Sequence, residues 1–211
     1  MGNAKTTRRD RRLLINRVEL YKPFAFYAVL LVALNAAALR GGDHAPAAVA
    51  AFVCAGLLAW GLVEYSIHRW VLHREPRLDD ARLHGNRVHL AHHADPYALD
   101  RLNVQLSESL PICAAYCLLA WAATGSWRSM TFLYDGLMLG YFFYEYLDYQ
   151  AHHGAARGRV VRYFRRYHLL HHHCDAEARF GVTSPLFDLV FGTYRVERKT
   201  TPSAGLHHSE I

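Results

Sequence analysis

Cysteine is scarce in this chain, and charged residues are missing from long parts of it. The 211 residues include 4 cysteines, of which Cys54, Cys113 and Cys117 fall in uncharged stretches and Cys174 in a polar one. We therefore expect no disulfide framework and interpret all four as small apolar side chains. Charged residues make up 20% of the chain and hydrophobic residues 52%, which excludes a disordered or collagen-like polypeptide.

The uncharged stretches are long enough to cross a bilayer. Runs of 17, 20 and 19 residues without Asp, Glu, Lys or Arg follow Lys22, Asp43 and Glu108, and a fourth apolar, aromatic run contains only Asp135 and Glu145. A spanning helix needs about 20 mostly apolar residues. A soluble bundle with buried core helices is the alternative. The sequence predicts an all-α integral membrane protein with four spanning helices, at about 23–39, 45–65, 109–127 and 129–147.

Basic residues are distributed unevenly around these spans. The two short loops within the predicted hairpins hold only Arg40 and Arg128, whereas the other 22 of the 24 basic residues lie elsewhere. Because Lys and Arg concentrate on the cytoplasmic side of membranes, both chain ends and the central region are expected to face the cytoplasm. We predict a single domain whose parts outside the membrane are a basic interfacial arm (1–22), a cytosolic cap (66–108 and 148–199) and a flexible tail (200–211).

The basic arm favours an anionic lipid surface as its partner. Nucleic acid is the rival for a chain with a net charge of +6, but the basic residues form no patch beyond the membrane flanks, so no nucleic-acid partner is expected. No apolar run occurs before residue 23 and no cleavage site closes the arm, so no signal peptide is expected. The 21 Arg against 3 Lys indicate a GC-rich bacterial genome, and hence a bacterial cytoplasmic membrane. The sequence does not specify the oligomeric state.

Histidine is abundant and clustered. Twelve of the 15 histidines lie within residues 68–93 and 152–173, both on the predicted cytosolic face. Clustered imidazoles would repel one another once protonated and would be costly to desolvate, so a shared cation is the physical reason to keep them together.

The spacing of these histidines suits helical ligand sites. The pattern H-x-x-H-H occurs twice and places three imidazoles within about 100° of one helical face, while Asp148 and His152 share a face one turn apart. His68 and His73 are five residues apart, so a regular helix would point them about 140° apart; they would then offer ligands in two directions unless the helix loosens there. The candidate metal ligands are His68, His73, His89, His92, His93, Asp148, His152, His168, His171 and His172.

Nine histidines and one carboxylate exceed the four ligands of a structural zinc site, so two metal ions are predicted. A nitrogen-rich pair of ions favours oxygen activation and attack on an apolar C–H bond, since hydrolytic sites more often use carboxylates. No catalytic residue is singled out beyond the metal centre. Four neighbouring side chains could orient the ligands, with spare polar groups as the alternative interpretation; these are His84, Glu145, His153 and His173.

Four motifs carry a family resemblance. EYSIHRWVLHREP, HLAHHADP, GYFFYEYLDYQAHHG and YHLLHHHCDAEARFGVTSPLFDLVFGT resemble the fatty acid hydroxylase/sterol desaturase superfamily over about residues 45–195, and are closest to its fatty acid 2-hydroxylase branch. The resemblance implies four spanning helices, a cytosolic helical cap and a His-bound dinuclear centre that uses O2 and reducing equivalents. It implies iron in the active form, with zinc as the alternative in a purified sample, and places the metal-binding positions on the nine histidines above.

The resemblance has one departure, because the branch has a histidine at the position of Asp148. The resemblance as a whole implies an acyl-chain hydroxylase that takes its lipid substrate from the bilayer, and it favours hydroxylation at C2. The chain has no room for a fused haem domain, so an external ferredoxin-like or cytochrome electron donor is expected. The alternatives are a sterol or carotenoid hydroxylase or desaturase, and a non-catalytic metal-binding or transport protein.

Two further features predict local structure. Ser184 and Pro185 are expected to begin a short amphipathic cap helix that Gly192 ends. The aromatic run from Tyr141 to Tyr149 is expected to form an interfacial belt, with an acyl tunnel as the alternative.

Overall fold

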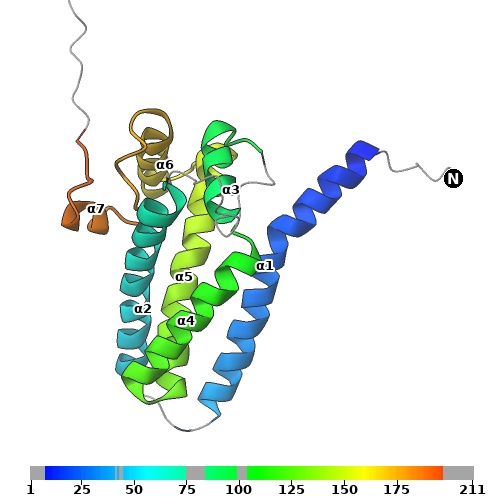
Figure 1. Ribbon diagram of the computed structural model, residues 1–211. Coiled ribbons are helices and arrows are strands. Elements are labelled where there is room, and N and C mark those ends of the chain that lie inside the picture. The colour runs from blue at the N-terminus through cyan, green and yellow to red at the C-terminus, as the bar shows by residue number, and fades with distance from the viewer. Residues whose placement is uncertain (1–7, 41, 43–44, 75–83, 99–103, 197–211) are drawn as a thin grey trace, which may run out of the picture.

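The computed structural model describes residues 8–40, 42, 45–74, 84–98 and 104–196, and within these ranges its regular structure is entirely helical (Figure 1). The all-helical prediction is therefore confirmed. All four cysteines are free. The helices in chain order are α1 (Arg8–Leu39), α2 (Pro46–Ile67), the π-helix η1 (His68–Leu72), α3 (His84–Ala94), α4 (Leu106–Thr124), α5 (Trp127–His152), α6 (Arg159–His173) and α7 (Leu186–Val190).

In the described part of the chain, three helical segments are long and apolar enough to cross a membrane. They are Tyr21–Leu39, Pro46–Leu72 and Leu106–Thr124, which correspond to the first three predicted spans. α5 is not among them. Its sequence carries Asp135, Glu145 and Asp148, which lower its hydropathy, so length and composition alone do not identify it as a span.

α5 forms the centre of the bundle and packs against α1, α2, α4 and α6 (Figure 1). Glycines allow α2 and α5 to approach closely: a Cβ on Gly56 would lie 2.0 Å from the carbonyl oxygen of Leu133, and one on Gly136 would lie 2.1 Å from that of Val53. Small residues at a helix crossing are a common means of close packing in membranes. The polar groups of α5 are thereby enclosed by neighbouring helices.

A short connection makes α4 antiparallel to α5. Gly125 ends α4 in the left-handed conformation (φ 62°), and Ser126 begins α5 by accepting a hydrogen bond from the backbone N–H of Ser129. Such a conformation favours glycine. At the same end of the bundle, the amide of Asn35 on α1 donates to Asp135 on α5 at 2.8 Å, which provides a partner for that half-buried carboxylate.

Residues 8–22 of the predicted arm are part of α1, which runs from Arg8 through Pro23 to Leu39, and residues 1–7 of the arm lie outside the described residues. Figure 1 shows its first half leading away from the bundle. The arginine side chains of the arm and the side chain of His84 lie outside the described residues, as does the predicted tail.

The remaining helices gather at one end of the bundle (Figure 1). Of these, α7 begins at Leu186, one residue later than predicted, and Ser184 Oγ accepts a hydrogen bond from its first N–H. Gly192, with φ 72°, follows the helix as expected. α7 packs against α2, where the ring of Phe187 would lie 3.1 Å from a Cβ on Gly61.

Candidate metal centre

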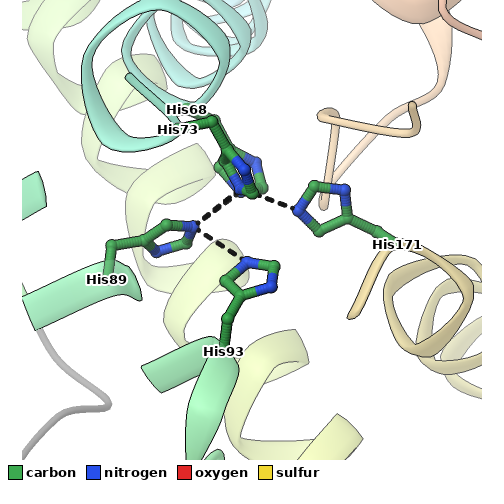
Figure 2. A group of neighbouring side chains, drawn as sticks. All are labelled: His68, His73, His89, His93 and His171. Atoms are coloured by element: carbon green, nitrogen blue, oxygen red, sulfur yellow. Dashed lines mark hydrogen bonds between the residues drawn. The ribbon is translucent and has the colours of Figure 1, made fainter. Parts of the chain in front are cut away.

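The structure brings all ten predicted ligand residues together, in two groups of five. In each group one potential ligand atom from every residue lies within 4.8 Å of the others. Cluster 1 consists of His68, His73, His89, His93 and His171, and is drawn in Figure 2. Cluster 2 consists of His92, Asp148, His152, His168 and His172.

The π-helical turn η1 brings His68 and His73 to the same cluster. The backbone N–H of His73 donates to the carbonyl of His68, five residues back, at 3.1 Å, which is the hydrogen-bond pattern of a π-helix. The Nε2 atoms of the two rings are 3.2 Å apart. The expectation that these residues offer ligands in two directions was wrong, because the helix loosens at this point, as the alternative predicted.

Each H-x-x-H-H motif supplies both clusters. On α3, His89 and His93 join cluster 1 while His92 joins cluster 2; on α6, His168 and His172 join cluster 2 while His171 joins cluster 1. The first and last histidines of the motif are four residues apart, so their directions around the helix differ by about 40°. The middle histidine points about 60° away from the first and about 100° away from the last. The divergence within each motif therefore directs its histidines to two centres.

Backbone carbonyls fix the tautomers of two rings in cluster 1. Nδ1 of His68 lies 2.6 Å from the carbonyl oxygen of Phe180, and Nδ1 of His171 lies 2.7 Å from that of Ala178. A carbonyl only accepts, so each Nδ1 carries the proton and each Nε2 presents a lone pair to the cluster. This is the arrangement expected of metal-binding histidines.

The Nε2 atoms of cluster 1 cannot satisfy one another by hydrogen bonds. The Nε2 atom of His68 lies 3.0 Å from that of His89 and 3.2 Å from that of His73, which are themselves 3.1 Å apart. Nε2 of His68 has a single lone pair, although the Nε2 atoms of both His89 and His73 lie within hydrogen-bond distance of it. Ligands about 2.1 Å from one ion, in directions near 90° apart, would be about 3.0 Å from each other, so a bound cation fits the observed separations.

Cluster 2 differs by containing a buried carboxylate. The Oδ1 atom of Asp148 lies 2.8 Å from Nε2 of His168, 3.4 Å from that of His152 and 3.6 Å from that of His92. These contacts lack hydrogen-bond geometry, and both carboxylate oxygens and the ring nitrogens around them have no other hydrogen-bond partner among the described residues. An unpaired buried carboxylate is costly, and a cation held between these groups would remove that cost.

Burial keeps the imidazoles in the neutral form that binds metals. It lowers the pKa of His73 to about 4 and, together with neighbouring imidazoles, that of His93 to about 3. Burial also lowers the pKa of His89 and His171 well below the usual range. Burial raises the pKa of Asp148, but its imidazole neighbours outweigh this and hold it well below the usual range.

Polar residues that the sequence analysis did not single out hold the ligands in place. Asn86, which is buried, donates to the carbonyl oxygens of Val71 and Leu72 at 3.2 and 2.7 Å, and so satisfies the end of the π-helical turn. The carboxylate of Asp188 accepts from the backbone N–H groups of Phe180 and Gly181, each at 2.8 Å.

The hydrogen bonds to the carboxylate of Asp188 fix the loop whose backbone carbonyls orient His68 and His171. A further carboxylate, Glu64, accepts from the N–H and hydroxyl of Thr183 on the same loop. A lone Asn, Asp or Glu has no periodicity, so no sequence signal distinguished these residues.

Three of the four predicted supporting residues, Glu145, His153 and His173, belong to neither cluster. Glu145 is buried and accepts from the N–H of Val104 at 3.3 Å, and His173 is exposed at the end of α6. His153 is half-buried, and its ring lies against Tyr97. The side chain of His84 is not described.

An apolar pocket adjoins cluster 1. It lies between α1, α2, α4 and α5, its lining includes Trp60, Met138, Tyr141 and Tyr144, and it reaches His68. Tyr141 and Tyr144 are buried, so they line this pocket, whereas Tyr146 and Tyr149 are exposed. The aromatic run therefore faces both the pocket and the surface, and the interfacial belt and the acyl tunnel stay predictions.

Comparison with known proteins identifies the family. The fatty acid hydroxylase family model matches residues 53–193. The chain belongs to the fatty acid hydroxylase family. All ten clustered residues lie inside the matched region, and family membership together with the clusters implies a metal-dependent enzyme of the membrane.

Several relatives of this fatty acid hydroxylase family are named as acyl 2-hydroxylases. The chain is 31% identical over 145 residues to dihydroceramide fatty acyl 2-hydroxylase FAH2 of Arabidopsis thaliana, covering 67% of this chain and 59% of that protein. It is 31% identical to the ceramide very long chain fatty acid hydroxylase SCS7 of Saccharomyces cerevisiae, covering 67% and 37%. The chain thus spans less than two thirds of the length of these relatives.

A solved structure of the family shares the fold. The structure titled full-length Scs7p, with only the hydroxylase domain visible, matches with a TM-score of 0.73 and 25% identity, covering 84% of this chain and 67% of that one.

Proposed function

We propose that the protein is an O2-dependent di-iron hydroxylase that acts on a fatty-acyl chain within the bilayer, with C2 as the favoured carbon. The observation that carries this proposal is that two neighbouring five-residue clusters lie beside an apolar pocket among candidate membrane helices, with cluster 1 reaching the pocket through His68. The naming of several relatives as acyl 2-hydroxylases supports the choice of carbon. It also disfavours a sterol or carotenoid substrate.

The ten clustered residues would hold the two metal ions, five for each. The neutral, buried imidazoles and the fixed tautomers of His68 and His171 fit an ion that prefers nitrogen ligands. When bound, two iron ions supply the reduction of O2 and the oxidative attack on the C–H bond.

The pocket supplies position and exclusion of water. Its aromatic and aliphatic walls suit an extended acyl chain, and its end at His68 places one carbon of that chain beside cluster 1. Residues from α2 and α4 both line the pocket, so a lipid substrate would enter from the bilayer between these two helices. An external ferredoxin-like or cytochrome protein would supply the electrons.

The proposed membrane arrangement includes α5 as the fourth span. α5 runs beside α2 and α4 (Figure 1), and most of its polar groups are buried against protein, which is how spanning helices accommodate such residues. The chain would form one domain, with the cap (66–108 and 148–199) facing the cytoplasm of a bacterium, the arm (1–22) on anionic lipid and the tail (200–211) beyond the cap.

Lipid analysis of a host tests the proposed activity. Cells expressing the wild-type chain are compared with cells expressing His92→Ala, and with cells expressing Arg195→Ala as a matched surface control. We expect 2-hydroxyacyl lipids with the wild type and the control only. If no lipid gains an oxygen atom with the wild type, the hydroxylase proposal is wrong; desaturated acyl chains in their place would support the alternative reaction on the same scaffold.

Metal analysis tests the two ions separately. We expect purified wild type to contain about two ions per chain. A value of one or fewer after reconstitution with Fe(II) or Zn(II) would contradict the dinuclear assignment.

A further inference from the structure

Apolar side chains are exposed on α7, although this helix belongs to the cap. Leu189 is 60% exposed and Val190 is 63% exposed, and Leu186 and Phe191 are exposed beside them. The exposed ring of Trp70 on η1 continues this surface, because its centroid lies 5.6 Å from that of Phe191. We call these five residues the apolar patch. A contiguous apolar surface of this kind marks an interaction site.

Aromatic contacts attach α7 to α2. The ring of Phe191 stacks on the buried ring of Tyr65 with 4.9 Å between centroids, and the ring of Phe187 lies beside Gly61. Leu57 lies one helical turn before Gly61 on the same side of α2, and it is exposed. The apolar patch therefore continues directly into the exposed apolar surface of a candidate spanning helix.

The position of α7 along α2 coincides with the edge of a bilayer. A helix from Pro46 to Tyr65 rises about 30 Å, which is the thickness of a hydrocarbon core. Figure 1 shows α7 beside the C-terminal end of α2. Trp70, five residues beyond Tyr65, then lies at the boundary between hydrocarbon and headgroups, where tryptophan is enriched.

The buried side of α7 leads to cluster 1. Asp188 is fully buried, and its carboxylate accepts from the backbone N–H groups of Phe180 and Gly181. Backbone carbonyls of the same loop accept from Nδ1 of His68 and His171, two members of cluster 1. A displacement of α7 would therefore reach the orientation of two candidate ligands through one carboxylate.

We propose that the apolar patch is inserted into the lipid interface of the bilayer, where headgroups meet acyl chains, and that this insertion steadies the loop that orients His68 and His171. Lipid is the occupant because the patch continues the surface of a candidate spanning helix and lies at the depth of the bilayer edge. The proposal rests on the proposed membrane arrangement and is independent of the reaction catalysed.

The short length of α7 explains why lipid contact matters. The helix has 5 residues, and a helix of this length is not stable by itself. Contacts with α2 and the hydrogen bonds of Asp188 hold one side of it. Insertion removes the apolar patch from water and stabilises the other side, so loss of insertion loosens the loop that Asp188 holds.

Fluorescence quenching tests whether the patch lies in lipid. A bimane label is attached to Leu189→Cys, with the four native cysteines replaced by alanine and one chain in each zwitterionic nanodisc. We expect quenching by lipids that carry a nitroxide on the acyl chain near the headgroup, as for a label at Leu58→Cys on the exposed side of α2. Aqueous iodide should quench the label about fivefold less than one at Glu177→Cys, which is exposed in the cap, because a charged ion is excluded from apolar surroundings.

Two results of this experiment would overturn the proposal. Strong quenching of the Leu189→Cys label by iodide would place the patch in water. Weak quenching by both agents would mean that protein covers the patch, whether another segment of this chain or a second copy.

Hydrogen exchange tests the link to cluster 1 in protein that keeps its native cysteines. In nanodiscs, Leu189→Glu/Val190→Glu should accelerate exchange of the backbone amides at 178–183 about tenfold, because charge keeps the patch out of the interface. Val160→Glu places the same charge at a 61% exposed residue of α6 and should change the rate by less than about twofold.

Equal exchange at 178–183 in the wild type and the double variant would overturn the link between lipid and loop. Acceleration of the same size in α4 would indicate general destabilisation and would overturn it as well. Neither measurement reads activity, so failure of this proposal is distinguishable from failure of the hydroxylase proposal.

Discussion

The Oδ1 atom of Asp148 lies 2.8 Å from Nε2 of His168, in a cluster whose other members are all imidazoles. The five residues of cluster 1 are neutral donors, whereas cluster 2 carries one negative charge. The two metal positions are therefore chemically unequal, and the inequality resides in a single side chain.

Replacing that carboxylate should affect one ion of the two. We expect Asp148→Asn to reduce the metal content from about two ions per chain to about one, because a neutral amide is a poor ligand and leaves four donors. Asp148→His should retain both. Glu145→Gln removes a buried carboxylate one helical turn away and should leave the metal content unchanged. Retention of two ions by Asp148→Asn would argue against its role as a ligand.

The π-helical turn should depend on Asn86. Asn86→Ala removes the donor to the carbonyls of Val71 and Leu72, and a carbonyl left without a partner costs about 1–3 kcal/mol when it is shielded from water. We expect a lower thermal midpoint and weaker metal retention against a chelator. Gln105→Ala, at an exposed amide that makes no cap hydrogen bond, is the comparison for a simple amide deletion. An unchanged midpoint and unchanged retention for Asn86→Ala would show that the turn forms without this support.

The crossing of α2 and α5 should tolerate no side chain at Gly56. A Cβ there would lie 2.0 Å from the carbonyl of Leu133, which is backbone and cannot move aside alone. We expect Gly56→Ala to destabilise the protein by about 3 kcal/mol, at the upper end of the range for overpacking.

Gly61 on the same helix provides the control for this crossing. A Cβ at Gly61 would meet only the ring of Phe187 at 3.1 Å, and that side chain can shift, so Gly61→Ala should cost less than about 1 kcal/mol. Unfolding followed in detergent compares the two variants with the wild type. Equal stabilities would mean that the helices are not in close contact at Gly56.

The metal-free protein should lose stability as the pH falls below about 6.5. The pKa of His73 is about 4 and that of His93 about 3 in the folded chain, against about 6.5 when unfolded. Between these values the unfolded chain binds protons that the folded chain does not, so the free energy of unfolding decreases with falling pH. The loss should level off once the pH passes below the folded pKa values.

Thermal unfolding of chelator-treated protein at about pH 7.5 and pH 5.5 measures this effect. The metal-loaded protein should show a steeper loss over the same interval, because protons then compete with the metal for the imidazoles. A midpoint that rises on acidification would contradict the pKa values assigned to His73 and His93.

The sequence was sufficient to predict which residues gather but not how they divide. Histidine abundance and helical spacing selected all ten members of the clusters, because an i, i+4 relation on a helix is a geometric fact that needs no tertiary structure. The division of His89, His92 and His93 between two centres depends on where α5 and α6 lie relative to α3. The same is true of the pairing of His68 with His73, which required a π-helical turn.

Long-range polar contacts were also beyond the sequence. Asp188 acts on a loop seven or eight residues before it and Glu64 on a loop 119 residues after it, and neither belongs to a periodic pattern. The three most apolar spans were predictable from hydropathy. α5 is harder to predict as a span. The cost of burying its polar groups is compensated by tertiary contacts, which a hydropathy average does not include.

The division of each H-x-x-H-H motif between two clusters has a consequence for how such a centre can arise. η1 serves cluster 1 alone and α5 serves cluster 2 alone, but α3 and α6 each serve both. Deleting or displacing either shared helix would dismantle both metal positions at once. η1 with the following His73, α3 and α6 carry all five residues of cluster 1, and α3, α5 and α6 carry all five of cluster 2. Either position could therefore have arisen first, the second being added through one further helix.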